Sequence, residues 1–156
     1  MKILLITDQH FGVRNDNQHF INHYARFYGK VVIPFIKASG IKEVISLGDT
    51  FDRRRYINFM SLDSAKEMWF DQLVKLGCNH TMLIGNHDIY YKNTLRVNAP
   101  HEILGEYNFD VIDKPTTKSY DGTDILLLPW ICDDNKSEVF EAVQRSKAPV
   151  CMGHLE

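Results

Sequence analysis

Short apolar segments alternate with stretches of helical periodicity in the first half of the chain, and this alternation restricts the possible folds more than any other feature. Apolar runs occupy residues 2–7, 43–49 and 80–86. Between them, apolar side chains recur at helical spacing over residues 18–39 and 61–77. The order strand, helix, strand, helix, strand predicts a layered α/β fold with a largely parallel central sheet.

Individual residues predict where the two long helices bend, begin and end. Pro34 lies within the first helix and is expected to distort it or split it in two. The second helix is predicted to begin at Ser61 or Asp63, either of which could cap it, and to end at Gly77. The rest of the chain predicts a short helix at 98–107, strands at 109–113 and 124–130 joined by a turn-rich segment at 114–123, a helix at 136–146 and a strand at 149–154.

The composition indicates one globular domain. The chain has 156 residues, 44% of them hydrophobic, which is enough for a sizeable core. Its formal net charge of -2 excludes the overall basic character of a polybasic DNA-binding protein, so any contact with nucleic acid must come from a local patch. The apolar N-terminal run is too short for a signal peptide or a membrane span, and we expect a cytoplasmic protein without membrane association.

The three cysteines, Cys78, Cys132 and Cys151, are odd in number and scattered along the chain. This suits reduced thiols in a cytosolic compartment better than a disulfide framework. We expect all three to be small buried hydrophobic side chains.

Polar residues that can bind metal or move protons follow four of the predicted strands. These groups are Asp8-Gln9-His10, Gly48-Asp49 with Asp52, Gly85-Asn86-His87-Asp88 and Gly153-His154. Each residue alone could be a turn residue, a helix cap or a surface histidine. In parallel sheets, however, ligands bind beyond the carboxyl ends of the strands. Four strand ends that bring carboxylate, imidazole and amide groups to one rim therefore favour a ligand site.

The donor types in these groups indicate which metal ions would bind. Carboxylate, imidazole and carboxamide ligands without thiolates suit manganese, iron or zinc rather than magnesium or calcium. An aspartate in a tight Gly-Asp turn, such as Asp49, can offer one oxygen to each of two ions. Two ions roughly 4 Å apart activate a hydroxide and neutralise a phosphoryl group. The pattern predicts a two-metal site, most simply for manganese, with His87 placed to donate to a phosphate oxygen or leaving group.

Taken together, the four motifs resemble those of the calcineurin-like metallophosphoesterases, and they span the chain almost end to end. Within that superfamily, the segments GDTFD, GNHD followed by YYKN, DKPTT and LLLPWICDDN are similar to those of SbcD-type nucleases of double-strand-break repair, including the recombination nuclease subunits of T-even-like phages. The resemblance implies a metallophosphoesterase-type layered sandwich.

The same resemblance implies a ligand set for each of two divalent ions. One ion would be held by Asp8, His10 and Asp49. The other would be held by Asp49, Asn86 and His154.

Three further residues receive roles from the resemblance. His87 would act on the scissile phosphate, and Asp88 would support it from behind. Asp52 closes the Gly-Asp-x-x-Asp motif and is expected to support a ligand rather than to bind metal.

The chain departs from the family pattern at its end. The family has a Gly-His-x-His motif downstream of Gly153-His154, with one histidine for each metal ion, and this chain stops at Glu156. We interpret residues 1–156 as the N-terminal part of a nuclease domain, incomplete at its C-terminus and without the capping domain; a naturally short relative is the alternative. The histidines outside the motifs, interpreted as surface or partly buried side chains, are His19, His23, His80 and His101.

The function favoured by the resemblance is a metal-dependent DNA nuclease, acting as an exonuclease or endonuclease in recombination and double-strand-break repair. It would work with an SbcC-like ATPase, in the host cytoplasm if the gene belongs to a phage. Two alternatives remain open. One is a phosphomonoesterase or cyclic-nucleotide phosphodiesterase with the same metals, and the other is a non-catalytic interaction module that keeps the fold.

Two groups of residues are candidates for contacts with partners. Basic side chains after the second and third motifs could bind DNA phosphates or form solvated charged loops, and they are Arg53, Arg54, Arg55, Lys92 and Arg96. The resemblance also implies a homodimer. We predict that the helices after the second and third motifs form its interface. The helix after the second motif carries large apolar side chains that could form this interface or belong to the core, and they are Phe59, Met60, Leu62, Met68, Trp69 and Phe70.

Overall fold

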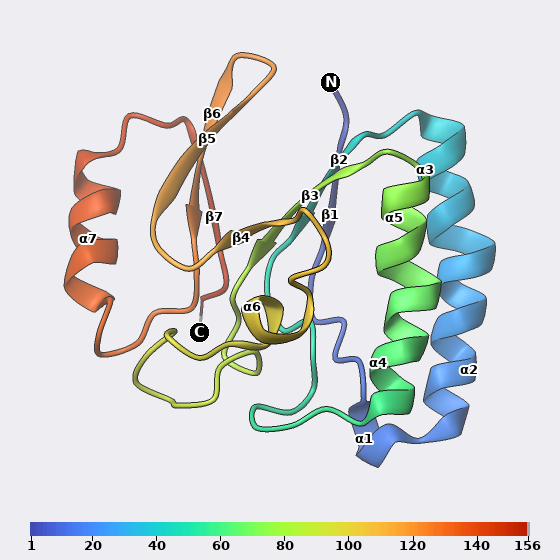
Figure 1. Ribbon diagram of the computed structural model, residues 1–156. Helices are drawn as coiled ribbons and strands as arrows, with labels where there is room; N and C mark the ends of the chain where they lie inside the picture. Colours follow the sequence, from blue (N-terminus) through green and yellow to red (C-terminus); the bar gives the residue numbers. More distant parts are fainter. Residues whose placement is uncertain (156) are drawn as a thin grey trace.

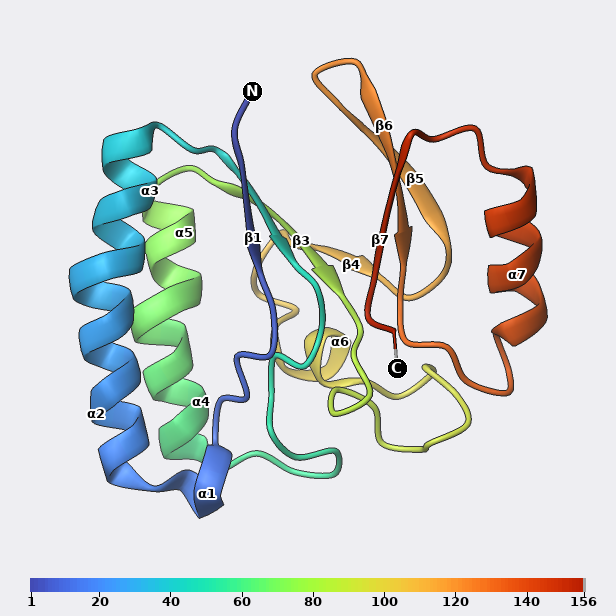
Figure 2. The same cartoon turned by 180° about the vertical axis from the view of Figure 1, so that it is seen from behind.

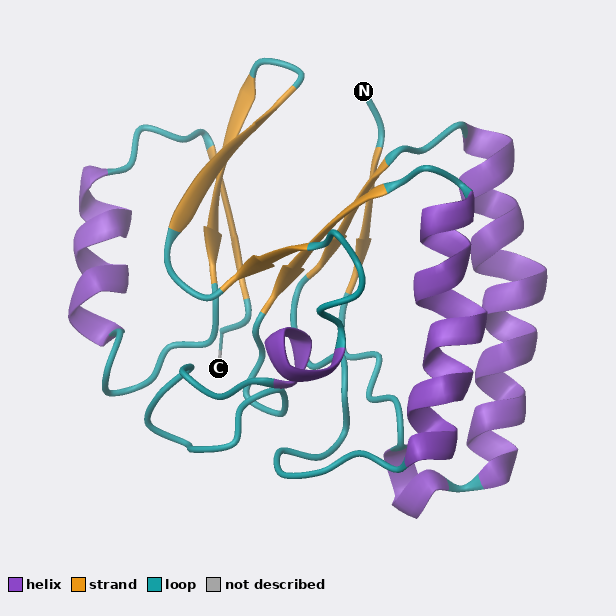
Figure 3. Ribbon diagram, in the orientation of Figure 1, coloured by secondary structure: helices purple, strands orange, loops and turns teal. Residues whose placement is uncertain are grey.

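The computed structural model describes residues 1–155, which contain seven strands and two long interrupted helices among shorter ones (Figure 3). The strands are β1 (Ile3–Ile6), β2 (Glu43–Ser46), β3 (Asn79–Leu83), β4 (Asp110–Ile112), β5 (Thr116–Tyr120), β6 (Thr123–Leu128) and β7 (Val150–Gly153). The helices are α1 (Val13–Asp16), α2 (Gln18–Phe27), α3 (Ile33–Ser39), α4 (Phe59–Ala65), α5 (Asp71–Lys75), α6 (Ala99–Ile103) and α7 (Lys136–Arg145). Two π-turns, η1 (Tyr28–Val32) and η2 (Lys66–Phe70), join α2 to α3 and α4 to α5.

These elements form two sheets between two helical layers. A four-stranded parallel sheet has the order β1-β2-β3-β4, and a three-stranded sheet has the order β5-β6-β7. Figures 1 and 2 show α2 to α5 covering one side of the first sheet and α7 covering the far side of the second. Ile45, Leu83, Tyr120 and Leu127 pack between the sheets. The predicted layered sandwich with a largely parallel central sheet is confirmed.

The register of the first sheet brings the carboxyl ends of its strands to one edge. Ile6, at the end of β1, lies opposite Ser46 at the end of β2, and Ser46 lies opposite Met82 near the end of β3. The loops that follow these three strands therefore leave the sheet side by side. This edge carries the predicted site residues.

The first long helix is distorted at its proline, as expected. Instead of a break, the chain forms the π-turn η1 just before Pro34, where the Ile33 N–H donates to the carbonyl of Tyr28, five residues back. A proline lacks an N–H group and its ring collides with the carbonyl four residues earlier, so a wider turn relieves the strain. The helix axis continues into α3, which ends at Gly40 with a φ of 65°.

The second long helix begins earlier than predicted. Its N-cap is Asn58, whose side chain accepts a hydrogen bond of 2.8 Å from the Met60 N–H. The prediction of Ser61 or Asp63 as the cap was wrong: the Ser61 hydroxyl donates to Asp16 at 2.6 Å, which ties this helix to the turn labelled α1. Gly77, with a φ of 62°, follows the end of the helix as expected.

One predicted turn segment is largely a strand. Within residues 114–123, β5 pairs antiparallel with β6, and the turn itself is confined to Asp121 and Gly122. Both turn residues have positive φ, as a tight two-residue hairpin requires. The turn-forming residues Pro115, Ser119, Asp121 and Gly122 hid the signal of a strand whose buried side chain is Tyr120.

Several burial predictions need correction. His80 is 2% exposed, and its ring lies against Phe70 and Phe109, so it is a core residue. Cys78, Cys132 and Cys151 are free thiols, but only Cys132 is buried: Cys78 is partly exposed, and Cys151, on the edge strand β7, is exposed. Across residues 1–155, no helix has the length and apolar character that crossing a membrane requires.

Acid is expected to weaken the fold through His80. Burial lowers the pKa of this histidine to about 3, whereas the unfolded side chain titrates near 6.5. Between these values the unfolded state binds one more proton, so this residue lowers the free energy of unfolding by about 1.4 kcal/mol for each pH unit below about 6. Urea unfolding between pH 7 and pH 4.5 measures the slope. His80→Phe should make it shallower, and His19→Gln, at an exposed histidine, should keep the wild-type slope; equal slopes in all three proteins would contradict the assignment.

Candidate metal centre

The loops after β1 and β2 continue side by side beyond the sheet. The backbone N–H groups of Asp8 and His10 donate to the carbonyls of Gly48 and Asp49, at 3.1 and 3.0 Å. Asp8, His10 and Asp49 all have positive φ, of 52°, 45° and 53°. Left-handed backbone at residues other than glycine is uncommon and costs free energy, and it concentrates at functional sites. Three of the five predicted ligands therefore lie on strained backbone.

Two glycines allow the loops to come close together. A Cβ atom at Gly85 would lie 2.3 Å from the backbone nitrogen of Asp49 and from its Oδ1. A Cβ atom at Gly48 would lie 2.6 Å from Nδ1 of His154, and Gly48 also has a φ of 103°. Since real Cβ atoms do not approach so closely, these positions require glycine.

Asp49 is the centre of the arrangement because its two carboxylate oxygens face different partners. Oδ2 lies 3.6 Å from Nε2 of His10, which is also 3.6 Å from Oδ1 of Asp8. Oδ1 lies 3.4 Å from Nε2 of His154. Asp49 is almost fully buried. Burial acts to raise the pKa of this carboxyl, but the hydrogen bonds from His154 and the His87 N–H lower it overall.

Asn86 brings a carboxamide group beside Asp49. One end of this amide lies 3.1 Å from both carboxylate oxygens of Asp49 and 3.0 Å from Nε2 of His154. Carboxylate, imidazole and carboxamide groups together are a donor set that manganese, iron or zinc ions accept. The donor atoms of Asp8, Asp49 and His154 also lie within 4.8 Å of one another. The residues present therefore fit a divalent metal ion.

The two candidate histidine ligands have polar groups behind them. The Nδ1–H of His154 donates to the carbonyl of Leu47 at 2.8 Å, so in the neutral ring the lone pair of Nε2 faces Asp49 and Asn86 and is free to bind a metal ion. Nδ1 of His10 lies 3.4 Å from Oδ1 of Asp52. A carboxylate or carbonyl behind a histidine is the usual outer support of a metal ligand. The interaction with Asp49 also raises the pKa of His154.

His87 lies at the opening between these groups. Its Nδ1 is 2.6 Å from the carbonyl of Asp52, and its backbone N–H donates to Oδ1 of Asp49 at 2.8 Å. Its ring lies edge-on to His10 at 4.9 Å, and a ring nitrogen lies within 4.8 Å of donor atoms of His10 and Asp49. The geometry therefore allows His87 to reach either a phosphate or a metal ion.

Asp88 has a different environment from the one expected. Its carboxylate is fully buried and accepts hydrogen bonds from the backbone N–H groups of Gly85, Thr50 and Phe51, at 2.9, 3.3 and 3.1 Å. Burial raises the pKa of this carboxyl, and the three donors oppose that rise. Asp88 joins the second and third motif loops, while the ring of His87 is supported by Asp52.

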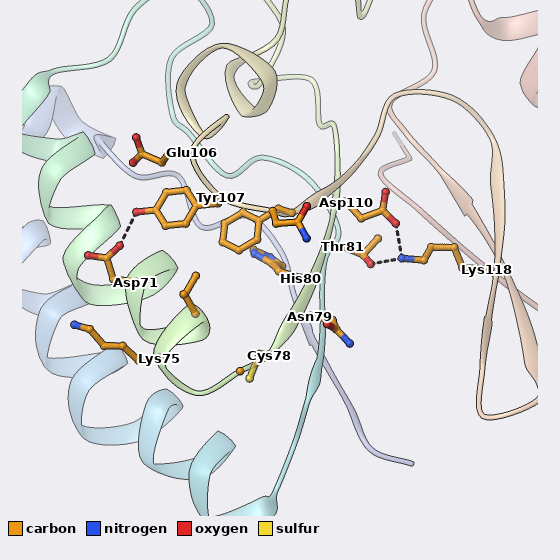
Figure 4. Close-up of a pocket in the computed structure, with 14 residues that line it drawn as sticks. Asp71, Lys75, Cys78, Asn79, His80, Thr81, Glu106, Tyr107, Asp110 and Lys118 are labelled. Carbon is orange, nitrogen blue, oxygen red and sulfur yellow. Dashed lines mark hydrogen bonds and ion pairs between the residues drawn. The ribbon is translucent and has the colours of Figure 1, made fainter.

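The basic residues after the motifs lie in two settings. Arg53 forms an ion pair with Asp16 at 2.9 Å, and Arg55 lies over the ring of Tyr90 at 5.4 Å. These two and Arg54 line a cavity of about 120 Å³ with Tyr90. Lys92 and Arg96 are exposed on the loop between residues 89 and 98, which a β-bridge closes. The larger cavity in Figure 4, of about 780 Å³, lies at the amino end of β3, away from this edge.

Sequence reasoning missed a group of buried polar residues behind the site. Gln9, between two predicted ligands, is 5% exposed and hydrogen-bonds to Tyr28 and Ser46. The position of Gln9 inside the first motif was the available signal. Trp130, from the LLLPW segment, lies edge-on to His154 at 6.1 Å.

Comparison with known proteins agrees with the geometry. Exonuclease subunit 1 of Enterobacteria phage T4 is 39% identical over 157 residues; the match covers all of this chain and 46% of the phage protein. The chain thus spans about half the length of this relative. A solved structure of a protein of unknown function from Aquifex aeolicus covers 98% of this chain and 89% of its own, with a TM-score of 0.48 and 17% identity, a likeness too low to bear on function. The pattern of the calcineurin-like phosphoesterases matches residues 1–147, and the chain belongs to this family.

Proposed function

We propose that this chain carries the metal-binding part of a DNA nuclease that hydrolyses phosphodiester bonds with two divalent ions, most simply manganese, or iron or zinc. The observation that supports this most directly is that the two carboxylate oxygens of Asp49 face different partners. One oxygen faces His10, and the other faces His154. A carboxylate with one oxygen toward each of two ligand groups is suited to bridge two ions.

The proposed roles follow from these contacts. Asp8, His10 and Asp49 hold one ion, and Asp49, Asn86 and His154 hold the other. Ions bound there would supply a hydroxide and neutralise charge on the phosphate.

His87 has the proposed role of the proton donor. Its Nδ1–H donates to the carbonyl of Asp52 at 2.6 Å, so in the doubly protonated ring Nε2–H is free to donate to the leaving oxygen or to a phosphate oxygen. Asp52 fixes the ring, and Asp88 holds the backbone that carries it.

DNA is the proposed substrate because the phage relative is named as an exonuclease subunit. The term subunit also supports partner proteins, and we propose an SbcC-like ATPase as the partner, in the cytoplasm of the host cell. The basic side chains are proposed to contact DNA phosphates, and they are Arg53, Arg54, Arg55, Lys92 and Arg96. Arg53 already has an ion-pair partner, so it is the weakest of these candidates.

A substrate comparison tests the nuclease proposal. With manganese present, a full-length version of the nuclease should degrade linear DNA and also cleave a chromogenic phosphodiester more slowly, whereas residues 1–156 alone could be inactive because each ion has only three ligands there. Cleavage of small phosphoesters with none of DNA would favour the phosphomonoesterase or cyclic-nucleotide alternative. Metal binding without any hydrolysis, in the full-length protein with its partner, would favour the non-catalytic module.

Replacing Asp49 should remove binding of both metal ions together. We expect calorimetric titration of the wild-type chain with manganese to show weak binding, because this chain supplies only three ligands to each ion. Asp49→Ala should abolish it, since both ligand sets share this carboxylate. Asp63→Ala, at an exposed aspartate on α4, is the control. Unchanged manganese binding in Asp49→Ala would refute the bridging role.

Replacing His87 should cost rate rather than metal affinity. A group that donates to the transition state adds little to ground-state coordination, so His87→Ala in the active nuclease should reduce turnover by roughly 100-fold or more. Manganese affinity should change little. His101→Ala, at an exposed histidine on α6, should match the wild type. If metal occupancy collapses while turnover per bound metal survives, His87 is a ligand instead.

The proposed dimer interface is smaller than the sequence suggested. Trp69 and Phe70 are fully buried core residues, so their assignment to an interface was wrong. Leu62 and Met68 are partly buried against the same core. Phe59 and Met60, at the start of α4, are 86% and 47% exposed and remain candidates.

Sedimentation across a concentration series tests the homodimer. If α4 lies in the contact, wild-type protein should dimerise at micromolar concentrations, and Phe59→Glu should weaken this association by introducing a charge into an apolar contact. Tyr56→Glu, at an exposed aromatic outside the helix, provides the comparison. A monomer at high micromolar concentration, with Phe59→Glu identical to wild type, would eliminate this interface.

A further inference from the structure

Behind the first motif, four buried polar side chains are hydrogen-bonded in series. We propose that Gln9, Tyr28, Ser46 and His80 are positioning residues that hold Asp8 and His10 in their metal-binding conformation. This inference rests on the proposed metal site and assigns a role to residues outside its ligand sets.

The backbone of the first motif needs such support. Asp8 and His10 flank Gln9, and both have left-handed φ. This conformation is unfavourable for aspartate and histidine, and it persists only where the surroundings over-determine it. The backbone hydrogen bonds to Gly48 and Asp49 restrain one side of the loop. Gln9 is the residue of the motif whose side chain is buried, while Asp8 is exposed.

Gln9 is held at both ends of its amide. Its Nε2 donates to the Tyr28 hydroxyl at 2.7 Å, and its Oε1 accepts from the Ser46 hydroxyl at 3.4 Å. Ser46 in turn lies 2.7 Å from Nε2 of His80. All four side chains are at most 5% exposed. Such buried polar groups are retained only when hydrogen-bonded, so each member fixes the position of the next.

The outer members of the series are themselves immobilised by packing. Tyr28 is the first residue of the π-turn η1, and its ring lies 5.1 Å from that of Trp69 in the π-turn η2. His80 lies in β3, where its ring is edge-on to that of Phe109 at 4.7 Å, and it lines the cavity in Figure 4. The series therefore connects the first motif to two interrupted helices and to the centre of the sheet.

Removing one link should displace the ligands rather than only loosen the core. Without the Tyr28 hydroxyl, the Gln9 amide would be buried without an acceptor, which costs free energy. The side chain can recover hydrogen bonds by turning toward water, and this movement rotates the backbone between Asp8 and His10. The ion held by these two ligands should then bind more weakly, whereas the ion near His154 should be affected less.

The test compares two tyrosines that each lose one buried hydroxyl. Tyr28→Phe removes the acceptor of Gln9. Tyr120→Phe is the matched control, because the Tyr120 hydroxyl is also buried and bonds to Thr81 at 3.1 Å, away from the first motif. Zinc, which is diamagnetic, is titrated into each purified protein, and the chemical-shift changes of the His10 and His154 imidazoles on direct coordination report each ion separately. Thermal unfolding of the metal-free proteins measures stability.

We expect Tyr28→Phe to weaken the ion near His10 by about tenfold, the scale of outer-shell substitutions at metal sites. The ion near His154 and both ions in Tyr120→Phe should stay within about twofold of wild type, although both variants lose stability. Ser46→Ala, which breaks the next link, should reproduce the effect and serves if Tyr28→Phe does not fold.

An unchanged zinc titration at His10 in both Tyr28→Phe and Ser46→Ala would overturn the positioning role while leaving the metal site intact. Equal weakening in Tyr120→Phe would also overturn it, because the effect would then follow general stability. Absence of both zinc and manganese binding in wild-type protein would instead remove the proposed function, and this inference with it.

Discussion

The buried carboxylate of Asp88 is the interaction on which the arrangement of the site depends. It accepts three backbone hydrogen bonds, from Gly85 on its own loop and from Thr50 and Phe51 on the neighbouring loop. A buried carboxylate is costly unless its oxygens are satisfied, so the two loops must stay in the conformation that supplies these donors. The relative position of Asp49 and Asn86, which belong to different motifs, follows from this contact.

Around that contact, the pairing of the strands fixes where they end, and the backbone of the loops beyond them is strained. The parallel sheet sets the three motif loops side by side, and glycines at 48 and 85 remove the side chains that would separate them. The strain then falls on three candidate ligands, Asp8, His10 and Asp49. The aligned strand ends of the parallel sheet thus bring together side chains that are distant in sequence, and the packing of the core behind them offsets the strain.

Most helices and strands, and the edge of the first sheet at which the motif residues gather, could be predicted from the sequence because both depend on local patterns. Polar groups directly after apolar runs identified Asp8, Asp49 and Asn86, and the sheet register brings these together. Other features depend on contacts that no local pattern contains. Asn58 caps α4 although Ser61 and Asp63 are equally good cap residues, because the Ser61 hydroxyl is engaged by Asp16.

The burial of individual side chains was harder to predict for a similar reason. His80 is buried by Phe70 and Phe109, one before it and one after it in the chain. Trp69 and Phe70 face the core, while Phe59 on the same long helix is exposed; the π-turn η2 shifts the face of the helix between them. A regular period of 3.6 residues cannot anticipate that shift.

The contact between His154 and Leu47 joins residues 107 positions apart. It can form only after β7 has paired with β6 and the second sheet has docked on the first. Bringing His154 beside Asp49 and Asn86 therefore means closing one of the longest loops in the chain. Closing such a loop has an entropic cost that local contacts avoid, and it places this step late in folding. A partly folded chain that lacks β7 would retain Asp8, His10 and Asp49 but could not complete the second ligand set. Full occupancy of the proposed metal site would thereby depend on the completed fold, and bound metal would in turn stabilise that fold against unfolding.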